Sequence, residues 1–483
     1  MRPLIFSAFE LTEESPIYTQ IEEYIKKGIN TGVLKKGYKL PSTRELSKLL
    51  NISRNSVLTA YENLEAQGVI KSLRGKGTFI DQEIEYRDEE LTINFEEMLS
   101  YYSKQCRQLD IIKTELPWKK GMISFKSIAP HESLFDLEEF KRAFLECISL
   151  EGNKILNYGY AKGYKPLIGY LMNYMEQKGV NTKNKDILIV NGFTEGMDLI
   201  LQTLTKPKDV IVCENPTHNT ALKMMRAHDL DIVGVCMNQD GIDTDELEKI
   251  LKLRQPKLGY MIPSYHNPTG IVLKAEKRQR ILEIYKKYQV PLIEDGFNEE
   301  LLYSSSPMLP IAALAPNSNG VIYIGSFSKI LFPGLRIGWI LADKKLVDVL
   351  ESVKRTRNIH TSFLDQAILY HYMISGSFER YIKKARKHYK DKYLFAMEQI
   401  NEFIPHEYIM GEGGLHIFVK LKGVCARDVL KRCAEKGVLF TPGDIFYVDK
   451  KEKSTLRLGF SRLSDEEIRK GIRVIGEVVK ELS

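Results

Sequence analysis

The sequence lacks the features that mark secreted, membrane-spanning or zinc-binding proteins. Its six cysteines are scattered, with no CxxC pair and no histidine spacing suited to zinc, so we expect reduced thiols and no metal. No apolar run is long enough to cross a membrane, and Glu10 interrupts the first residues too soon for a signal peptide. We therefore expect a cytoplasmic protein with no membrane partner.

Internal repeats, low-complexity tracts and the glycine signatures of nucleotide-binding loops are missing as well. These absences argue against a repeat architecture and against P-loop or dinucleotide chemistry. What remains is the composition of an ordinary globular protein, with 43% hydrophobic and 28% charged residues. At 483 residues the chain is too long for one core, and its length predicts about three domains.

The net charge of +7 is distributed unevenly along the chain. Eleven Lys or Arg and three Glu lie between Lys26 and Ile80, so this segment carries +8 and the remaining chain carries −1. Basic charge concentrated in one small segment predicts a polyanion-binding module joined to a nearly neutral body.

The pattern of this basic segment predicts a helix-turn-helix followed by a hairpin. One helix starts at Ser15-Pro16, a second begins with a capping box at Ser42–Glu45, and Ser53 caps a third. Strand-like residues flank Arg74–Gly77 and predict a basic wing. A small helical bundle with a solvated charged face is the alternative interpretation.

The polar side chains of the segment lie where a DNA-binding fold would use them. The first turn of the third helix, where a recognition helix meets base edges, carries Arg54, Asn55 and Ser56. The segment, from Leu-Pro-Ser-Thr-Arg-Glu-Leu to Arg-Gly-Lys-Gly-Thr-Phe, resembles the winged helix of GntR-type bacterial transcription regulators. The resemblance implies a double-stranded DNA operator contacted by Arg44, Arg54, Asn55, Ser56, Gly75 and Lys76, and Arg74 is placed to take a phosphate. Leu58 replaces an arginine of some members, so the base preference does not carry over.

The rest of the chain predicts a linker and two further domains. Residues 82–118 are charged and weakly apolar, which predicts a linker after residues 1–81. From residue 119 to 342, short apolar runs alternate with amphipathic helical stretches and predict an α/β domain with a mainly parallel sheet. Residues that carry chemistry then gather at the carboxyl ends of the strands. Residues 343–483 change to an α+β pattern and predict a smaller C-terminal domain.

The stretch Gly325–Trp339 carries the strongest chemical signal. Lys329 lies there in a turn among apolar residues, and desolvation lowers the pKa of a lysine and makes it a nucleophile. Ser326, Ser328 and Arg336 supply donors for a phosphate. An imine-forming amine beside an anion site is the combination that pyridoxal phosphate requires. The block resembles the lysine motif of fold-type I aminotransferases.

Further motifs follow predicted strands in the order that this family shows. Asn267, in the run His-Asn-Pro-Thr-Gly, would hydrogen-bond the cofactor's phenolic oxygen, and Asp295 would keep the pyridine nitrogen protonated. A helix opening at Asn191–Glu195 suits the phosphate. His218 lies where the family carries a ring stacked on the pyridine, and it adds a group that can titrate. The resemblance implies a pyridoxal 5'-phosphate site with Lys329 and Asp295 catalytic and with cofactor contacts from Lys329, Asp295, Asn267, Gly192, Phe193, Thr194, His218, Ser326, Arg336 and Tyr158.

Two further positions bear on the assembly and on a second ligand. Tyr158, in the run Leu-Asn-Tyr-Gly, resembles the tyrosine that reaches the neighbouring subunit's cofactor phosphate, which implies a homodimer. Alternating patterns at residues 413–418 and 455–460 predict half-buried strands. An arginine in the second strand would by default be exposed, but the resemblance makes Arg457 the clamp for the α-carboxylate of an amino acid.

A winged helix followed by an aminotransferase-like body resembles the MocR-type subfamily of GntR regulators over nearly the full chain. The implied fold is a winged helix-turn-helix joined to a fold-type I, pyridoxal-phosphate-dependent transferase domain with a smaller α+β C-terminal domain. The implied function is transcription regulation, with pyridoxal phosphate or an amino-acid-like effector sensed through an aldimine at Lys329. Phe297 occupies a position that usually carries tyrosine, so we expect weak transamination.

Two alternatives remain open from the sequence. An active aminotransferase that converts amino acids and 2-oxo acids, and carries a fused DNA-binding domain, fits the same motifs. A binding module that has lost the cofactor fits less well, because Lys329, Asp295 and Arg336 are intact.

Replacing Arg54 tests the assignment of DNA binding to the first ~80 residues, the part that carries the basic charge. Arg54→Ala should cost about 1–3 kcal/mol of operator affinity if the guanidinium contacts a base, as measured by titration of labelled operator DNA. Binding should also weaken steeply with salt, because basic groups neutralise phosphates. Operator binding by a fragment of the remaining chain as tight as that of the whole protein would contradict the assignment.

Overall fold

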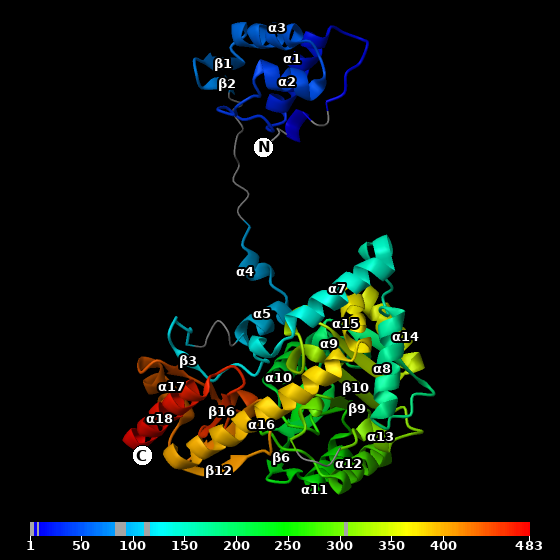
Figure 1. The fold of residues 1–483 in the computed structure, drawn as a ribbon, viewed down its shortest axis with the longest axis vertical. Helices are drawn as coiled ribbons and strands as arrows, with labels where there is room; N and C mark the ends of the chain where they lie inside the picture. The colour runs from blue at the N-terminus through cyan, green and yellow to red at the C-terminus, as the bar shows by residue number, and fades with distance from the viewer. Residues whose placement is uncertain (1–3, 7–8, 83–92, 111–115, 304–307) are drawn as a thin grey trace. The chain divides into compact units, whose positions relative to one another are not determined.

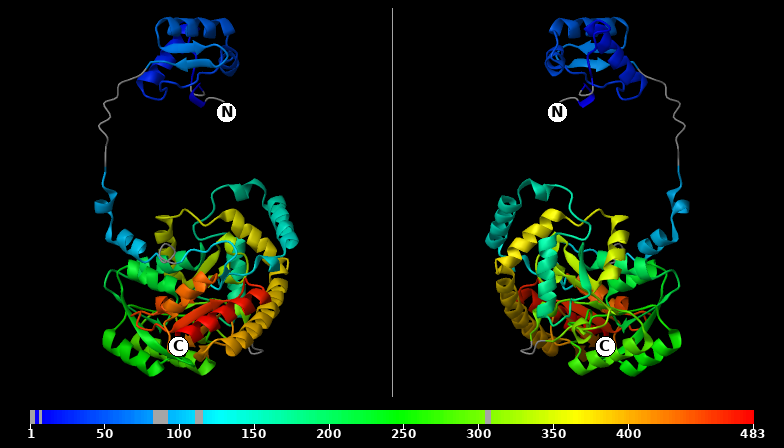
Figure 2. Two further views of the ribbon diagram at one scale, coloured as in Figure 1. Left: turned by 90° about the vertical axis from the view of Figure 1, so that its left-hand side faces the viewer. Right: turned by 90° about the vertical axis from the view of Figure 1, so that its right-hand side faces the viewer.

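The computed structural model describes residues 4–6, 9–82, 93–110, 116–303 and 308–483 (Figure 1). The chain divides into two compact units, Met1–Met98 and Leu99–Ser483, each with its own core (Figure 2). Within the described residues, no helix is both long enough and apolar enough to cross a membrane.

The first unit is a three-helix fold with a two-stranded hairpin. Its elements are η1 (Leu4–Phe6), α1 (Ile17–Asn30), α2 (Thr43–Leu50), α3 (Arg54–Ala66), β1 (Ile70–Leu73) and β2 (Gly77–Ile80). The predicted capping box is confirmed, since the Ser42 side chain accepts from the Glu45 backbone N–H and the Glu45 carboxylate accepts from that of Ser42. Asn51 then takes a left-handed conformation, and this tight turn separates α2 from α3.

The core of this unit is formed by one apolar side of each element. Ile25 of α1, Leu46 of α2 and Val57 of α3 are fully buried together. The hairpin contributes Ile70 and Ile80, which pair across the two strands. The hairpin tip and the first turn of α3 thus remain on the surface, because their residues do not contribute to the core.

The second unit is built on an eight-stranded sheet. In spatial order its strands are β4 (Lys185–Val190), β11 (Gly338–Asp343), β10 (Val321–Ser326), β9 (Leu292–Asp295), β8 (Leu258–Met261), β5 (Val210–Asn215), β6 (Asp231–Asn238) and β7 (Gly241–Ile242). The strands from β10 to β6 are parallel, whereas β11 runs antiparallel to both of its neighbours and β7 runs antiparallel to β6. The predicted α/β class is confirmed.

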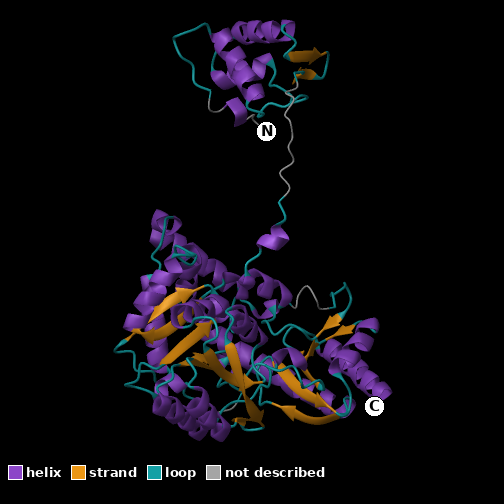
Figure 3. Cartoon of the chain, turned by 180° about the vertical axis from the view of Figure 1, so that it is seen from behind, coloured by secondary structure: helices purple, strands orange, loops and turns teal. Residues whose placement is uncertain are grey.

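Helices cover both faces of this sheet (Figure 3). Along β4, Ile187 and Ile189 join one apolar cluster while Leu188 and Val190 join another, as the alternation of side chains in a strand requires. The first cluster includes α8 (Lys165–Gln177), α11 (Thr244–Arg254), α12 (Ala275–Tyr288), α13 (Ile311–Leu314) and α15 (Phe363–Ile374); the second includes α9 (Gly192–Leu204), α10 (Asn219–Ala227) and α14 (Lys344–Arg355). Burial on both faces explains the continuous apolar runs of the central strands.

The strand register brings three sequence motifs to one edge of the sheet. Gly338 of β11 pairs with Val190 on one side and with Ser326 on the other. The chain that leaves β4 and the chain that leaves β10 therefore emerge side by side. On the far side of β10, Ile324 pairs with Asp295 at the end of β9. The candidate phosphate, lysine and acid motifs thus meet because of strand pairing rather than because of their positions in the sequence.

The C-terminal part is a smaller α+β domain with an antiparallel sheet. Its elements are β12 (His406–Met410), β13 (His416–Leu421), β16 (Thr455–Gly459), β15 (Thr441–Pro442), α16 (Ser377–Phe403), α17 (Ala426–Glu435) and α18 (Asp465–Leu482), and β14 (Val438–Leu439) pairs with β3 (Ile123–Ser124). The prediction of half-buried strands was wrong, because all of β16 is buried. Leu456 and Leu458 join an apolar core, and Arg457 between them is buried against Asn267.

Two helices lie in the region predicted as a linker, α4 (Phe95–Met98) and α5 (Tyr101–Gln108). The second packs on α10, where the Tyr101 hydroxyl donates to Asp229 over 3.0 Å. The rings of Tyr102 and His228 lie edge to face, 5.8 Å apart. The segment Leu99–Gln108 is therefore anchored to the second unit.

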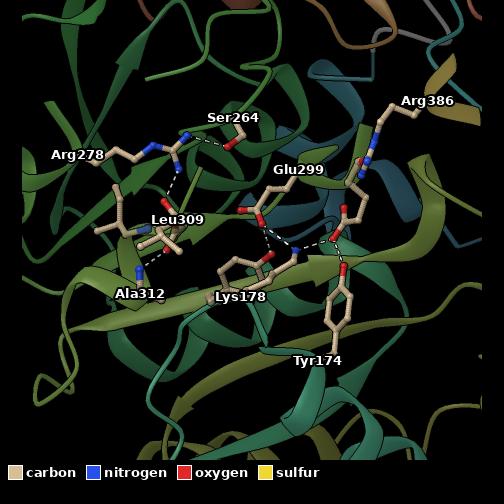
Figure 4. Close-up of polar contacts among 12 residues, drawn as sticks. Tyr174, Lys178, Ser264, Arg278, Glu299, Leu309, Ala312 and Arg386 are labelled. Carbon is tan, nitrogen blue, oxygen red and sulfur yellow. Dashed lines mark hydrogen bonds and ion pairs between the residues drawn. The ribbon is translucent and has the colours of Figure 1, made fainter. Parts of the chain in front are cut away.

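A network of buried charges fixes η4 (Glu299–Leu301), the turn that follows β9 (Figure 4). The Lys178 ammonium bridges the carboxylates of Glu299 at 2.9 Å and Glu300 at 2.6 Å. Arg386 of α16 donates twice to the backbone carbonyl of Glu300, over 2.8 and 3.1 Å. One lysine thus offsets part of the negative charge of two adjacent acids that burial would otherwise disfavour.

Lys178→Met should destabilise the second unit by about 3–5 kcal/mol, because it leaves two buried carboxylates without their cation. Urea unfolding followed by tryptophan fluorescence measures this directly, since Trp118 and Trp339 both belong to the second unit. The matched control is Lys287→Met, which breaks an exposed pair with Glu248 and should leave the unfolding midpoint unchanged. Equal shifts for the two variants would contradict a special role for the Lys178 network.

Candidate functional site

A cavity of about 180 Å³ opens at the carboxyl edge of the large sheet. This is the edge at which α/β proteins bind ligands. Its wall consists of Phe193, Thr194, His218, Thr220, Asp295, Phe297, Asn298, Ser326, Ser328, Lys329 and Arg336. Seven residues predicted from the sequence for the cofactor site line this cavity: Lys329, Asp295, Phe193, Thr194, His218, Ser326 and Arg336. An eighth, Gly192, lies next to Arg336.

Lys329 lies in η5 (Phe327–Lys329), a short turn directly after β10. The Ser326 side chain starts this turn by accepting from the Ser328 backbone N–H. Burial, together with the nearby guanidinium groups of Arg457 and Arg336, lowers the pKa of the Lys329 amine to about 8. A substantial fraction of this amine is therefore neutral, and thus nucleophilic, just above neutral pH.

An anion cradle lies beside the lysine. The Arg336 guanidinium donates to the Ser328 hydroxyl over 3.0 Å and to the Asn191 backbone carbonyl over 3.1 Å. Gly192 is required at the start of α9, because its φ is +79° and an added Cβ would lie 2.9 Å from Arg336 Nη2. The first backbone N–H groups of α9 have no partner within the helix. The Arg336 guanidinium and these N–H groups together provide the hydrogen-bond donors and the positive electrostatic field that a phosphate needs.

Asp295 ends β9, is buried and lines the same cavity. Burial raises the pKa of its carboxyl to about 7, while a hydrogen bond donated by the Tyr260 hydroxyl over 2.9 Å opposes this shift. A cationic group bound against Asp295 would restore full ionisation. The residue can therefore hold a proton on a ring nitrogen.

Asn267 and Arg457 come together although 190 positions separate them. Arg457 Nη1 donates to Asn267 Oδ1 over 2.8 Å, Nη2 donates to the Lys126 carbonyl over 3.2 Å, and the guanidinium lies 4.9 Å from the centre of the Phe446 ring. Asn267 Nδ2 is buried and has no hydrogen-bond partner in the described part of the chain. A buried arginine fork next to an amine is suited to a carboxylate.

His218 behaves differently from its prediction. Burial lowers the pKa of its imidazole to about 3, and the positive charges of Arg457 and Lys329 act in the same direction. The expectation that this residue adds a titrating group was therefore wrong, because it stays neutral across the physiological range. Its ring lies 5.3 Å from that of Phe193, so the two form one aromatic side of the cavity.

Tyr158 does not reach the cavity of its own chain. Its side chain is 78% exposed and its ring lies edge to face with His360, at 6.1 Å. The adjacent side chains of Leu156 and Tyr160 are exposed too. The protomer therefore presents this tyrosine outward.

The residues predicted to contact DNA are on the surface of the first unit. Arg54 and Asn55 occupy the first turn of α3, and Arg54 Nε donates to the Thr43 hydroxyl over 3.4 Å. Arg74, Gly75 and Lys76 form the exposed tip between β1 and β2, where Gly75 has a φ of +74°. Arg44 and Ser56 complete the predicted set on α2 and α3.

Several site residues were not predicted from the sequence, namely Tyr260, Thr220, Asn298 and Phe446. Tyr260 lies inside an apolar strand, where a tyrosine is usually a packing residue. Asn298 directly follows Phe297, and an asparagine in a turn is usually a local capping group. Only the tertiary contacts distinguish these roles.

These observations define a class of protein: a winged helix-turn-helix unit joined to an aminotransferase-type body. Residues 128–475 match the family model "Aminotransferase class I and II", and residues 17–80 match "Bacterial regulatory proteins, gntR family". The chain belongs to the aminotransferase class I and II family, and with its GntR helix-turn-helix domain it is a transcription regulator of MocR-type architecture.

Individual proteins match one or both parts. An uncharacterized HTH-type transcriptional regulator, YdfD of Bacillus subtilis, is 28% identical over 481 residues, which is 97% of each chain. Aromatic-amino-acid aminotransferase 1 of Thermococcus litoralis is 29% identical over 83% of this chain and 99% of its own. The crystal structure of the multiple substrate aminotransferase of Thermococcus profundus has a TM-score of 0.75 at 31% identity, over 80% of this chain and 99% of that chain.

The ionisation of Lys329 provides a test of its environment. Its labelling by acetic anhydride, in protein freed of bound small molecules, should rise with a midpoint near pH 8, because the neutral amine reacts and burial lowers its pKa. Quantitative mass spectrometry of the peptide that contains Lys329 measures this rate. A midpoint near the ordinary lysine value of about 10.4 would show that the amine is solvated.

Proposed function

We propose that this transcription regulator holds pyridoxal phosphate at Lys329 and changes its promoter output in response to the cofactor or to a small amino-acid-like effector. The observation that carries the proposal is one cavity in which a lysine of lowered pKa, an anion cradle and a buried acid converge. The GntR-type unit on the same chain supports a regulatory rather than a purely metabolic role.

The cavity has a residue suited to each reactive or charged group of this cofactor. Arg336, Ser328 and the start of α9 would hold the phosphate, Asp295 would hold the proton on the pyridine nitrogen, and Lys329 would bind the aldehyde carbon. Asn267 Nδ2 is buried and has no hydrogen-bond partner in the described part of the chain, so it would donate to an acceptor on the ring. When bound, pyridoxal phosphate supplies an electrophilic carbon and an electron-withdrawing ring. The solved α-aminoadipate aminotransferase of Thermus thermophilus, which holds a phosphopyridoxyl-leucine, supports this assignment at 27% identity and a TM-score of 0.74.

The effector that fits best carries a primary amine and a carboxylate. Arg457 is buried and its Nη1 is already bound to an amide oxygen, that of Asn267, so a carboxylate would replace a weaker neutral acceptor. Its positive charge lowers the pKa of the Lys329 amine, so the two groups lie near each other. An amino acid could therefore present its carboxylate to Arg457 and its amine in place of that of Lys329.

We also infer that the protein forms a homodimer through the surface around Tyr158. Leu145 on α7 (Leu137–Glu151) is 66% exposed, and Leu156 and Tyr158, which follow this helix in the chain, are 72% and 78% exposed. Exposed large apolar side chains favour association with another protein surface. In such a dimer Tyr158 would reach the phosphate of the partner's cofactor.

A working aminotransferase is the second candidate. The lowered pKa of Lys329 and the buried Asp295 favour it, since both suit catalysis by pyridoxal phosphate. Phe297 opposes it, because this side chain cannot donate to the phenolic oxygen of the cofactor.

Lys329→Ala separates the two candidates. The variant should shift operator DNA at the same concentrations as the wild type, because Lys329 belongs to the second unit and the winged helix to the first. Its promoter output should no longer respond to added cofactor and effector, since a ligand biases only a state that it binds differently. An in vitro transcription assay and a gel-shift assay measure the two properties, with the exposed Lys344→Ala on α14 as the matched control.

A purely metabolic role predicts the opposite pattern for the same variant. Conversion of amino donors to 2-oxo acids would then be lost while the promoter response stayed intact. A normal response in the absence of the visible absorbance of lysine-bound cofactor would contradict the sensor proposal.

A further inference from the structure

Two neighbouring residues after β9, Phe297 and Asn298, differ in their capacity to donate a hydrogen bond into the cavity. Phe297 lines the cavity with hydrocarbon only, and its ring lies 6.5 Å from that of His416. Asn298, the next residue, lines the same cavity and is only 2% exposed. Of these two neighbours, only the asparagine carries a side chain that can donate a hydrogen bond.

The Asn298 amide is buried without using either of its polar atoms. Neither Oδ1 nor Nδ2 has a hydrogen-bond partner among the residues that the structure describes. The residue precedes η4 in a left-handed conformation with a φ of 57°, but its side chain makes no capping bond. A buried amide that satisfies no bond is costly, and it calls for a partner that enters the cavity.

The backbone around Asn298 is held firmly. Directly after it, Glu299 and Glu300 are bridged by Lys178, and Arg386 donates to the Glu300 carbonyl (Figure 4). Three residues before it, Asp295 is hydrogen-bonded to Tyr260. The backbone that carries the amide is thus held on both sides of Asn298.

The chemistry of the ligand leaves one atom for this amide. In the function proposed above, the cradle of Arg336 takes the phosphate, Asp295 takes the ring nitrogen and Lys329 takes the aldehyde carbon. The remaining polar substituent of pyridoxal phosphate is its phenolic oxygen, which accepts hydrogen bonds when ionised and can take a second donor besides Asn267. We propose that Asn298 is a cofactor-binding residue whose Nδ2 donates to this oxygen and supplies the bond that Phe297 cannot make.

This inference rests on the proposed function, and a purely structural role is its competitor. Asparagine tolerates left-handed backbone better than most residues, so it could be present for the turn alone. A structural role predicts that replacement weakens every ligand of the cavity alike. A hydrogen bond to the phenolic oxygen predicts a loss only for ligands that possess that oxygen.

The experiment compares two ligands on the full-length protein. Dissociation constants are measured by equilibrium dialysis for pyridoxal 5'-phosphate and for its 3-deoxy analogue, which lacks the phenolic oxygen. Asn298→Gly removes the amide and keeps the left-handed backbone accessible. It should weaken the natural cofactor about ten-fold, as expected for one hydrogen bond to a charged acceptor, and leave the analogue unchanged.

A second variant and a control protect the comparison from folding effects. Asn298→Asp keeps the shape of the side chain but replaces the donor by an acceptor, so the ratio of the two dissociation constants should shift in the same direction. Gln289→Gly changes an exposed residue with a φ of 56° outside the cavity, and should leave both constants unchanged. Equal weakening of the two ligands by Asn298→Gly would overturn the inference and leave the proposed function standing. Failure of the wild type to bind either ligand would overturn both.

Discussion

Like charges held close together are the constraint on which the site of this protein depends. The Lys329 amine lies close enough to Arg336 and Arg457 for both guanidinium groups to lower its pKa. Such repulsion is strong where water is excluded. Each arginine is therefore anchored to neutral acceptors, Arg336 on Ser328 and Arg457 on Asn267. A ligand with anionic groups at two places, such as a phosphate and a carboxylate, would offset the same repulsion.

The large sheet makes this arrangement possible by bringing strand ends together. Because β11 pairs with β4 and with β10, Asn191 and Ser328 lie near enough for Arg336 to bind both. Charged groups behind the cavity add rigidity, since Lys178 and Arg386 fix the turn after β9. Few of these contacts are local, so the site exists only in the folded body.

Local signals were the part of the structure that could be predicted. The capping box at Ser42, the apolar runs of the central strands and the turn around Lys329 depend on residues close in sequence, and the structure has them where they were expected. Strand β11 was not predicted, because its first residues belong to the block around Lys329, which was interpreted as a single motif.

Long-range contacts account for the rest. Tyr260 and Asp295 meet across neighbouring strands. Arg457 of the smaller C-terminal sheet is buried against Asn267, which follows a strand of the large sheet. No pattern in the sequence announces such pairs. The neutral state of His218 also depends on burial and on distant cations, which is why its assignment as a titrating group was wrong.

Helix α10 joins two features that serve different purposes. His218 at its start lines the cavity, and just past its other end Asp229 receives the hydroxyl of Tyr101 from α5. The nine-residue helix spans about 13 Å. Toward the N-terminus the chain continues from α5 to the winged-helix unit, so α10 has the cavity wall at one end and the contact with α5 at the other. Linkage is reciprocal. If a movement of α5 displaces α10 and thereby changes ligand affinity in the cavity, then ligand binding changes the free energy of that movement by the same amount.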